Sequence, residues 1–178
     1  SSFAFILTLW GSKYLHLVHN INKSNLSFLL MFMALSWSIG SIFFGFIEKK
    51  LQQKKNIIIF SSITMCVLLG GLCLNFNYNY YSLLIIFSLI GFFGAFTLVL
   101  ISHYRVLFNQ KIIGKVLTTA NLFNFSGVFF VQWLTGLIIF QSKKQYNFSN
   151  YSSFSLAFLV VIFFLCVSIY FYSKTDEV

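Results

Sequence analysis

The stretch from Ser36 to Lys55, SWSIGSIFFGFIEKKLQQKK, joins two apolar segments through a connection rich in lysine. Its first half carries small residues four positions apart, Ser36 with Gly40 and Ser41 with Gly45. Such pairs let two helix backbones approach closely in a bilayer, where packing replaces the hydrophobic driving force. Its second half holds four lysines, and short cationic connections between membrane helices stay on the cytoplasmic side. The stretch therefore predicts two membrane helices that are joined on the cytoplasmic side.

The composition of the whole chain agrees with a membrane protein. Hydrophobic residues make up 58% of the sequence and charged residues 8%, whereas soluble domains carry about 25% charged residues. A hydrocarbon core of about 30 Å is crossed by about 20 apolar residues. Six segments approach or exceed that length: Phe3–Ile21, Leu26–Ile47, Asn56–Leu74, Tyr81–Ser102, Ile112–Phe140 and Phe154–Tyr172. We expect a single all-α integral membrane domain over residues 1–178, with six transmembrane helices.

The basic residues alternate between the connections of these segments. The second and fourth connections and the carboxyl-terminal tail hold eight of them: Lys49, Lys50, Lys54, Lys55, Arg105, Lys111, Lys115 and Lys174. The first, third and fifth connections together hold three: Lys23, Lys143 and Lys144. Because positive connections stay inside, the pattern predicts that both termini are cytoplasmic.

The net charge of +9 does not indicate a nucleic-acid-binding protein. The lysines lie at the ends of apolar segments and form no basic stripe on a polar surface. Attraction to anionic lipid head groups accounts for that placement. The cysteines Cys66, Cys73 and Cys166 lie within apolar segments, so we expect buried free thiols rather than disulfides or a metal site.

The first apolar segment contains a lysine inside its length. Trp10, Lys13, Tyr14 and Leu17 follow one another at helical spacing and share a face. Lys13 lies about eight residues before the end of the segment, roughly 12 Å deep at a rise of 1.5 Å per residue. A charged amine at that depth costs about 2.5–3.5 kcal/mol unless it meets water or a partner. We therefore expect this face either to line a wet cavity, where Lys13 binds an anionic substrate group, or to hold Lys13 against backbone carbonyls.

The fifth apolar segment is the most polar of the six. Six of its residues follow one another at helical spacing: Thr118, Asn121, Phe125, Val128, Gln132 and Thr135. Asn124 lies one turn after Asn121. Carboxamide side chains in a bilayer seek water or hydrogen-bonding partners. Asn121, Asn124 and Gln132 are therefore predicted to line a substrate cavity or, alternatively, to join neighbouring helices.

The residues that most enzymes need are missing from the apolar segments. The only acids, Glu48, Asp176 and Glu177, lie outside or at the ends of these segments, so no carboxylate pair for hydrolysis is present within them. No spacing of histidine or cysteine is typical of a metal site, and no glycine-rich loop is suited to phosphate. We interpret His103 and Arg105, the one pair that looks catalytic, as an anchor in a connection. We expect no enzyme activity, no metal and no cofactor.

Two stretches resemble the major facilitator superfamily of transporters, in its bacterial type. The first comprises LWGSKYL at residues 9–15 and the connection after Gly45, which is similar to the family's cytoplasmic motif of a glycine, an acid and basic residues. In the family that motif helps to gate alternating access, so the resemblance implies gating roles for Gly45, Glu48 and Lys49. Here the spacing from the glycine to the acid is one residue shorter than the common form.

The second stretch, from His103 to Gly136, is the stronger match. It is similar to the penultimate helix of bacterial members, with the pair Gly114 and Lys115 before the helix and Asn121, Gly127, Gln132 and Gly136 along it. The resemblance covers nearly the whole chain, as helices seven to twelve. It implies a half-bundle of three-plus-three inverted repeats, in which the third and sixth helices face lipid and the other four line the transport path.

The resemblance implies a secondary transporter that moves a small solute across the bacterial inner membrane by alternating access. Trp10, Lys13, Tyr14, Asn121, Asn124 and Gln132 are the candidate cavity residues, and Lys13 favours an anionic solute. Transport would require an amino-terminal six-helix half or a second copy of the chain, and we expect the native chain to begin before Ser1. The alternative is a six-helix membrane scaffold or assembly partner that transports nothing.

Overall fold

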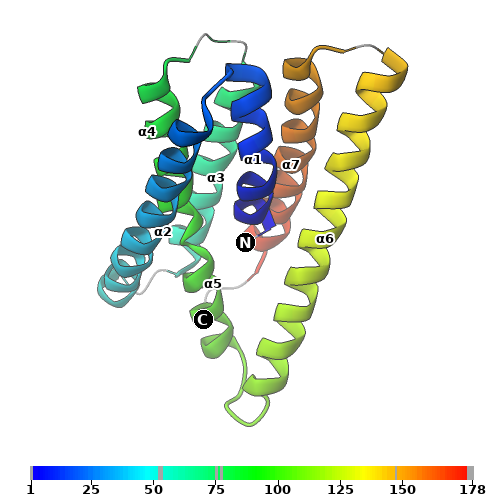
Figure 1. Ribbon diagram of the computed structural model, residues 1–178. Coiled ribbons are helices and arrows are strands. Elements are labelled where there is room, and N and C mark those ends of the chain that lie inside the picture. Colours follow the sequence, from blue (N-terminus) through cyan, green and yellow to red (C-terminus); the bar gives the residue numbers. More distant parts are fainter. Residues whose placement is uncertain (1, 52–53, 75, 77, 147, 176–178) are drawn as a thin grey trace.

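The structure is a computed structural model that describes residues 2–51, 54–74, 76, 78–146 and 148–175; for residues 2–9, 51, 145 and 146 it describes the backbone and not the side chains. The described chain consists of helices and their connections (Figure 1). The helices are α1 (Ser2–His19), α2 (Lys23–Leu51), α3 (Lys54–Cys73), α4 (Tyr80–Gly94), α5 (Thr97–Leu107), α6 (Ile113–Tyr146) and α7 (Asn150–Ser173). The predicted all-α fold is confirmed.

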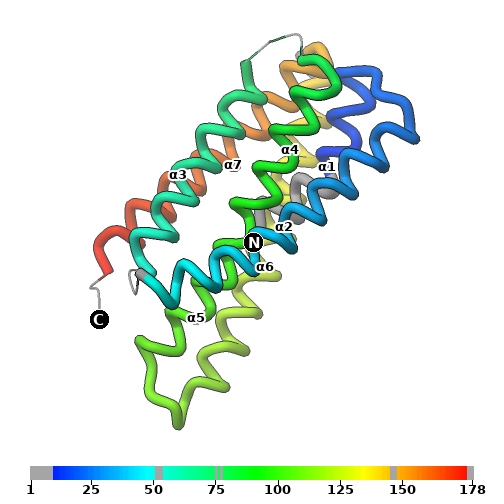
Figure 2. Tube along the Cα trace, turned by 90° about the vertical axis from the view of Figure 1, so that its left-hand side faces the viewer, coloured from blue at the N-terminus to red at the C-terminus, as the bar shows by residue number. Residues whose placement is uncertain are grey.

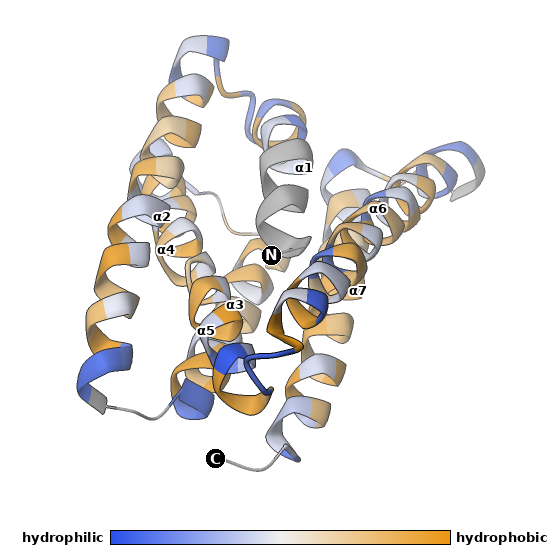
Figure 3. Cartoon of the chain, turned by 90° about the horizontal axis from the view of Figure 1, so that it is seen from below, coloured by the Kyte–Doolittle hydropathy of each residue, from blue (hydrophilic) through white to orange (hydrophobic). Residues whose placement is uncertain are grey.

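Five stretches of the described chain are long and apolar enough to cross a membrane: Lys23–Lys50, Lys54–Cys73, Tyr80–Leu107, Ile113–Lys144 and Asn150–Ser173. Apolar residues cover most of their length, and hydrophilic residues gather at their ends (Figure 3). These helices are compatible with an integral membrane protein. The predicted sixth span corresponds to α1, and the side chains of its first half lie outside the described residues.

The predicted span Tyr81–Ser102 corresponds to one apolar stretch, Tyr80–Leu107, which consists of two helices. The helix is interrupted after Gly94, where α4 ends and a short turn leads into α5. In that turn the amide of Ala95 donates to the carbonyl of Phe92 at 3.3 Å, three residues back, as in a 3₁₀-helix. Since the chain contains no proline, the interruption arises from this local tightening beside Gly94.

Helices α2 and α4 cross in close contact at two glycines. A Cβ atom at Gly40 of α2 would overlap the carbonyl oxygen of Phe92, and one at Gly91 of α4 would overlap the carbonyl oxygen of Met33. The expected close approach at Gly40 is therefore present. Gly45 does not take part, because a Cβ atom there would meet nothing within 4 Å. Five residues rotate a helix by about 140° beyond one turn, so Gly45 faces away from the contact made by Gly40.

The connections alternate between two ends of the bundle. The end of α2, the start of α3, the α5–α6 connection and the end of α7 lie at one end of the bundle (Figures 1 and 2). We call it the lysine-rich end after Lys49, Lys50, Lys54, Lys55 and Lys111. The α1–α2, α3–α4 and α6–α7 connections lie at the opposite end, which we call the tyrosine end after Tyr14, Tyr78 and Tyr151. The alternation agrees with the lysine pattern, and the orientation of these ends in a membrane stays a prediction.

Helix α3 has one buried and one exposed side. Met65, Leu69 and Leu72 are buried in the core, where α3 packs against α4 and α7. Phe60 and Val67 are exposed on its other side. The third helix thus presents only one apolar side to its surroundings, while its other side contributes to the core of the bundle.

Candidate functional site

The predicted polar face of α1 is divided by the structure. Tyr14 is completely buried and stacks edge-on against Phe154 and Phe158 of α7, at centroid distances of 5.7 and 5.2 Å. Lys13 is exposed, and its Nζ lies 4.7 Å from the ring centroid of Trp10. Successive residues of a helix point about 100° apart, which separates these neighbours. Tyr14 is thus a core residue, whereas Lys13 and Trp10 stay together on an accessible side.

Trp10 connects this side of α1 to α6. A Cβ atom added at Gly136 of α6 would lie 3.3 Å from the indole of Trp10, so the ring packs over that glycine. The indole Nε1 is buried and has no hydrogen-bond partner among the described residues. A buried donor without a partner costs about 1–3 kcal/mol. The ring that lies next to the amine of Lys13 therefore holds a buried donor that makes no hydrogen bond among the described residues.

The carboxamides of α6 lie on one side of that helix at different depths. Asn121 is exposed, and Asn124 and Gln132 are half-buried. At 1.5 Å per residue, Gln132 lies about 6 Å and Asn121 about 22 Å along the helix from Gly136. Gln132 therefore lies about one turn from the glycine that Trp10 covers, and Asn121 lies farther toward the lysine-rich end. Without Tyr14, which lies in the core, the other five candidates form a line along α1 and α6 rather than one compact cluster.

The predicted gating residues have different environments. Glu48 of α2 forms an ion pair with Lys54 of α3, with Oε1 and Nζ 2.9 Å apart. Ser102 of α5 donates its hydroxyl hydrogen to Glu48 and accepts a hydrogen bond from Lys54 at 2.9 Å. Lys49 and Gly45 are exposed. Glu48 thus joins three helices through Lys54 and Ser102, and Lys49, its neighbour in the resembled motif, is not part of that contact.

Two further contacts at the lysine-rich end were not found by sequence reasoning. His103 of α5 is buried and its Nδ1 hydrogen-bonds to the hydroxyl of Tyr172 on α7. Lys55 donates to the carbonyl of Thr175 at 2.6 Å. The interpretation of His103 as an anchor agrees with this geometry, and its anchoring partner is α7. No sequence signal identifies Tyr172, because the two residues lie 69 positions apart.

The tyrosine end satisfies the last carbonyls of α3 with hydroxyl groups. Tyr14 donates to the carbonyl of Leu72 at 3.2 Å, Tyr78 to that of Gly71 at 2.6 Å, and Tyr151 to that of Cys73. The final carbonyls of a helix have no partner within the helix. Three tyrosines from α1, the α3–α4 connection and α7 therefore complete the end of α3.

One of these tyrosines lies outside the predicted spans, in the connection between α3 and α4. Burial, with smaller contributions from Tyr151 and Cys73, raises the pKa of Tyr78 above its usual value. The phenol therefore keeps its proton to a higher pH than an ordinary tyrosine does. It remains a donor to the carbonyl of Gly71.

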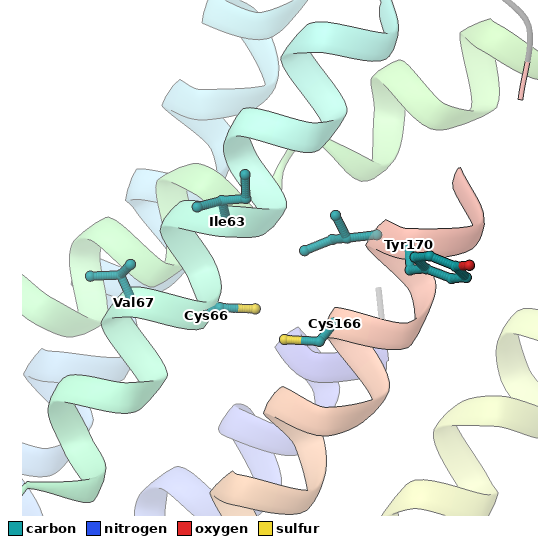
Figure 4. Close-up of a pocket in the computed structure, with 6 residues that line it drawn as sticks. Ile63, Cys66, Val67, Cys166 and Tyr170 are labelled. Atoms are coloured by element: carbon teal, nitrogen blue, oxygen red, sulfur yellow. The ribbon is translucent and has the colours of Figure 1, made fainter. Parts of the chain in front are cut away.

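A groove between α3 and α7 holds two of the three cysteines. Cys66 and Cys166 extend from the two helices with their thiols pointing toward each other (Figure 4). Ile63, Val67, Ile169 and Tyr170 complete the lining. The three thiols are free, and in the described chain no three His, Cys, Asp or Glu side chains are grouped so as to hold a metal ion.

Comparison of the sequence with protein-family models and curated proteins, and of the fold with solved structures, finds no match.

Proposed function

We propose that this chain is the carboxyl-terminal half of a secondary transporter of the major facilitator type, which moves a small solute across a membrane by alternating access. The observation that supports the proposal best is the exposure of polar groups on apolar helices. Lys13 and Asn121 are both exposed, Lys13 near the exposed Leu17 on α1. Asn121 lies beside the exposed Leu122, Phe123 and Phe125 on α6.

The energetic cost of these groups favours a water-filled cavity. A lysine facing lipid costs about 2.5–3.5 kcal/mol near the centre of a membrane helix. A second helical half packed against α1 and α6 would cover the polar line and leave water around it. The exposed Lys13 amine, held over the Trp10 ring, would then bind a small anionic group.

The contact between Glu48, Lys54 and Ser102 supplies a gating element for this mechanism. It ties α2, α3 and α5 together at one end of the bundle. An ion pair near the membrane surface is weak enough to break and re-form during a conformational cycle, because such pairs contribute only about 0–1 kcal/mol.

The test is solute uptake by cells that express the longest reading frame containing this sequence. Candidate anions and neutral solutes are supplied together, and their accumulation is measured by mass spectrometry. Lys13→Ala and Asn121→Ala should each lower uptake of the transported solute by at least about tenfold, since each removes a polar contact to the solute. Both variants should still insert into the membrane.

Thr119→Ala is the matched control, because Thr119 is exposed on another side of α6. Its uptake should equal that of the unaltered protein. If Lys13→Ala and Asn121→Ala abolish folding instead, these residues join helices, and the alternative of a membrane scaffold or assembly partner is favoured. Uptake unaffected by either substitution would contradict the proposed cavity.

A further inference from the structure

A second groove lies between α2 and α3 with α4 as its floor. Its lining includes Phe43 and Ile47 of α2, Asn56 and Phe60 of α3, and Phe92 and Phe93 of α4. The rings form a continuous wall: the centroid distances are 5.2 Å from Phe43 to Phe92, 5.4 Å from Phe92 to Phe93 and 6.2 Å from Phe93 to Phe60. This groove is independent of the polar line on α1 and α6.

The groove is open along the side of the bundle. Phe43 is 47% exposed and Phe60 is 64% exposed, whereas Phe44, at its inner edge, is buried. The groove therefore forms an open channel, with a large, partly exposed side chain on each of its two walls. A second helix packs best on small residues, which let the helices approach closely. The walls of this groove lack small residues, whereas a flexible hydrocarbon chain can fit between large side chains.

A positive charge lies at the end of the groove. Phe43, Ile47 and Lys50 follow one another at i, i+4 and i+7 on α2, so they form one stripe that leads from the aromatic wall to the lysine-rich end. Lys50 and its neighbour Lys49 are exposed. The carboxylate of Glu48 is engaged by Lys54 at 2.9 Å, on a different side of α2.

We infer that this groove binds one acyl chain of an anionic phospholipid, with the phosphate of the lipid held by Lys50 and Lys49. The apolar channel matches the chain, and the lysines at its end match the charge of the head group. Both features occur at the boundary between apolar helix and charged connection, where the head groups of a bilayer lie. The inference does not depend on transport activity.

Native mass spectrometry of the purified chain tests the binding. The protein is released from vesicles that contain equal amounts of dioleoyl phosphatidylglycerol and dioleoyl phosphatidylcholine, and the retained lipids are counted. We expect the anionic lipid to be retained preferentially. The double variant Lys49→Gln/Lys50→Gln should lower this preference by roughly fivefold for each lysine that contacts the phosphate.

The matched control is the double variant Lys143→Gln/Lys144→Gln, which removes two lysines from the tyrosine end of the bundle. It should leave the preference unchanged. Equal losses in both double variants would show a general attraction of lysines for anionic lipid and would overturn the assigned site. Retention of both lipids in equal amounts by the unaltered chain would also overturn it.

A fluorescence experiment locates the acyl chain. With Trp10, Trp37 and Trp133 replaced by phenylalanine, Phe60→Trp places one reporter in the groove, and Phe163→Trp places one on α7, where Phe163 is 63% exposed. Phosphatidylglycerol with brominated chains should quench the groove reporter more strongly than brominated phosphatidylcholine does. The reporter on α7 should be quenched equally by both.

The groove assignment is contradicted if the ratio of quenching by the two brominated lipids is the same at both reporters. If the variants without native tryptophans lose helicity by circular dichroism, the mass-spectrometric comparison of the two lysine pairs decides the question with the native tryptophans in place.

Discussion

The two ends of α3 are held by different chemistry. At the lysine-rich end the ion pair of Glu48 and Lys54, joined by Ser102, connects α2, α3 and α5. At the tyrosine end neutral hydroxyls of Tyr14 and Tyr78 donate to the last carbonyls of the helix. The tyrosines satisfy unpaired carbonyls of the helix terminus, whereas the contact at the lysine-rich end joins side chains to one another. The contacts at the two ends differ in how deeply their side chains are buried and in how easily water replaces their hydrogen bonds.

This difference indicates which end is permanent and which can open. Tyr14 is completely buried, so loss of its hydrogen bond leaves a carbonyl without water. The side chains of Glu48 and Lys54 are 17% and 20% exposed, so water and salt reach the ion pair. The tyrosine end is therefore expected to dominate stability, and the lysine-rich end to allow rearrangement.

The largest expected effect concerns the middle of α3, between its two ends. If both ends hold α3 against α7, copper–phenanthroline with oxygen should oxidise Cys66 and Cys166 to one intramolecular disulfide, with oxygen accepting the two electrons. Peptide mass spectrometry should find these two residues joined, and Cys73 should stay reduced. Cys66→Ser should abolish the product. Cross-linking only between separate chains would contradict the packing of α3 on α7.

A smaller effect is expected from the tyrosine end. Tyr14→Phe keeps the ring between Phe154 and Phe158 but removes the hydroxyl that donates to Leu72. The free energy of unfolding should fall by about 1–3 kcal/mol, the cost of a buried carbonyl without a partner. Denaturation in mixed detergent micelles, followed by circular dichroism, measures this change.

Tyr81→Phe is the control for that measurement. Tyr81 is 77% exposed on α4, so removal of its hydroxyl should change the free energy of unfolding by less than about 0.5 kcal/mol. An equal loss of stability in the two variants would remove the distinction drawn for Tyr14.

The smallest effect is expected from the lysine-rich end. Glu48→Gln should lower the free energy of unfolding by about 0.5–1 kcal/mol at low salt, because it breaks a partly exposed ion pair. The loss should be smaller in 0.5 M salt, because ions screen the attraction between partly exposed charges. The screening length is about 8 Å at roughly one third of that concentration and is shorter in 0.5 M salt. Lys49→Gln, outside the ion pair, should have no such salt-dependent effect. If Glu48→Gln were more destabilising than Tyr14→Phe, the assignment of the permanent end would be reversed.

Most of the helices could be predicted from the sequence because a bilayer demands long apolar runs. The interval from Asn56 to Leu74 was predicted as one helix, and α3 occupies Lys54–Cys73. The turn at Ala95 was not predicted, because its hydrogen bonds change by only one residue in register within an unbroken apolar run. Gly40 was correctly expected in a close contact, but its partner Phe92 on α4 was not identified.

The candidate site was less predictable. Lys13 and Tyr14 were assigned to one face, since residues 100° apart can share a broad stripe, yet one is exposed and the other is buried. Glu48 was grouped with Lys49 by sequence order, and its charged partner is Lys54. Which side of a helix is buried depends on the helices that pack against it. The spacing of residues along one helix carries no information about those neighbours.

The amino-acid sequence by itself determined the all-α class, the approximate helices and the alternation of basic connections, because these follow from apolar length and charge along one chain. The tertiary structure decided which residues meet: Tyr14 with Leu72 across 58 positions, Ser102 with Glu48 across 54, and Cys66 with Cys166 across the α3–α7 groove. Such pairs depend on the rotation and crossing of helices. Only packing in three dimensions sets those quantities.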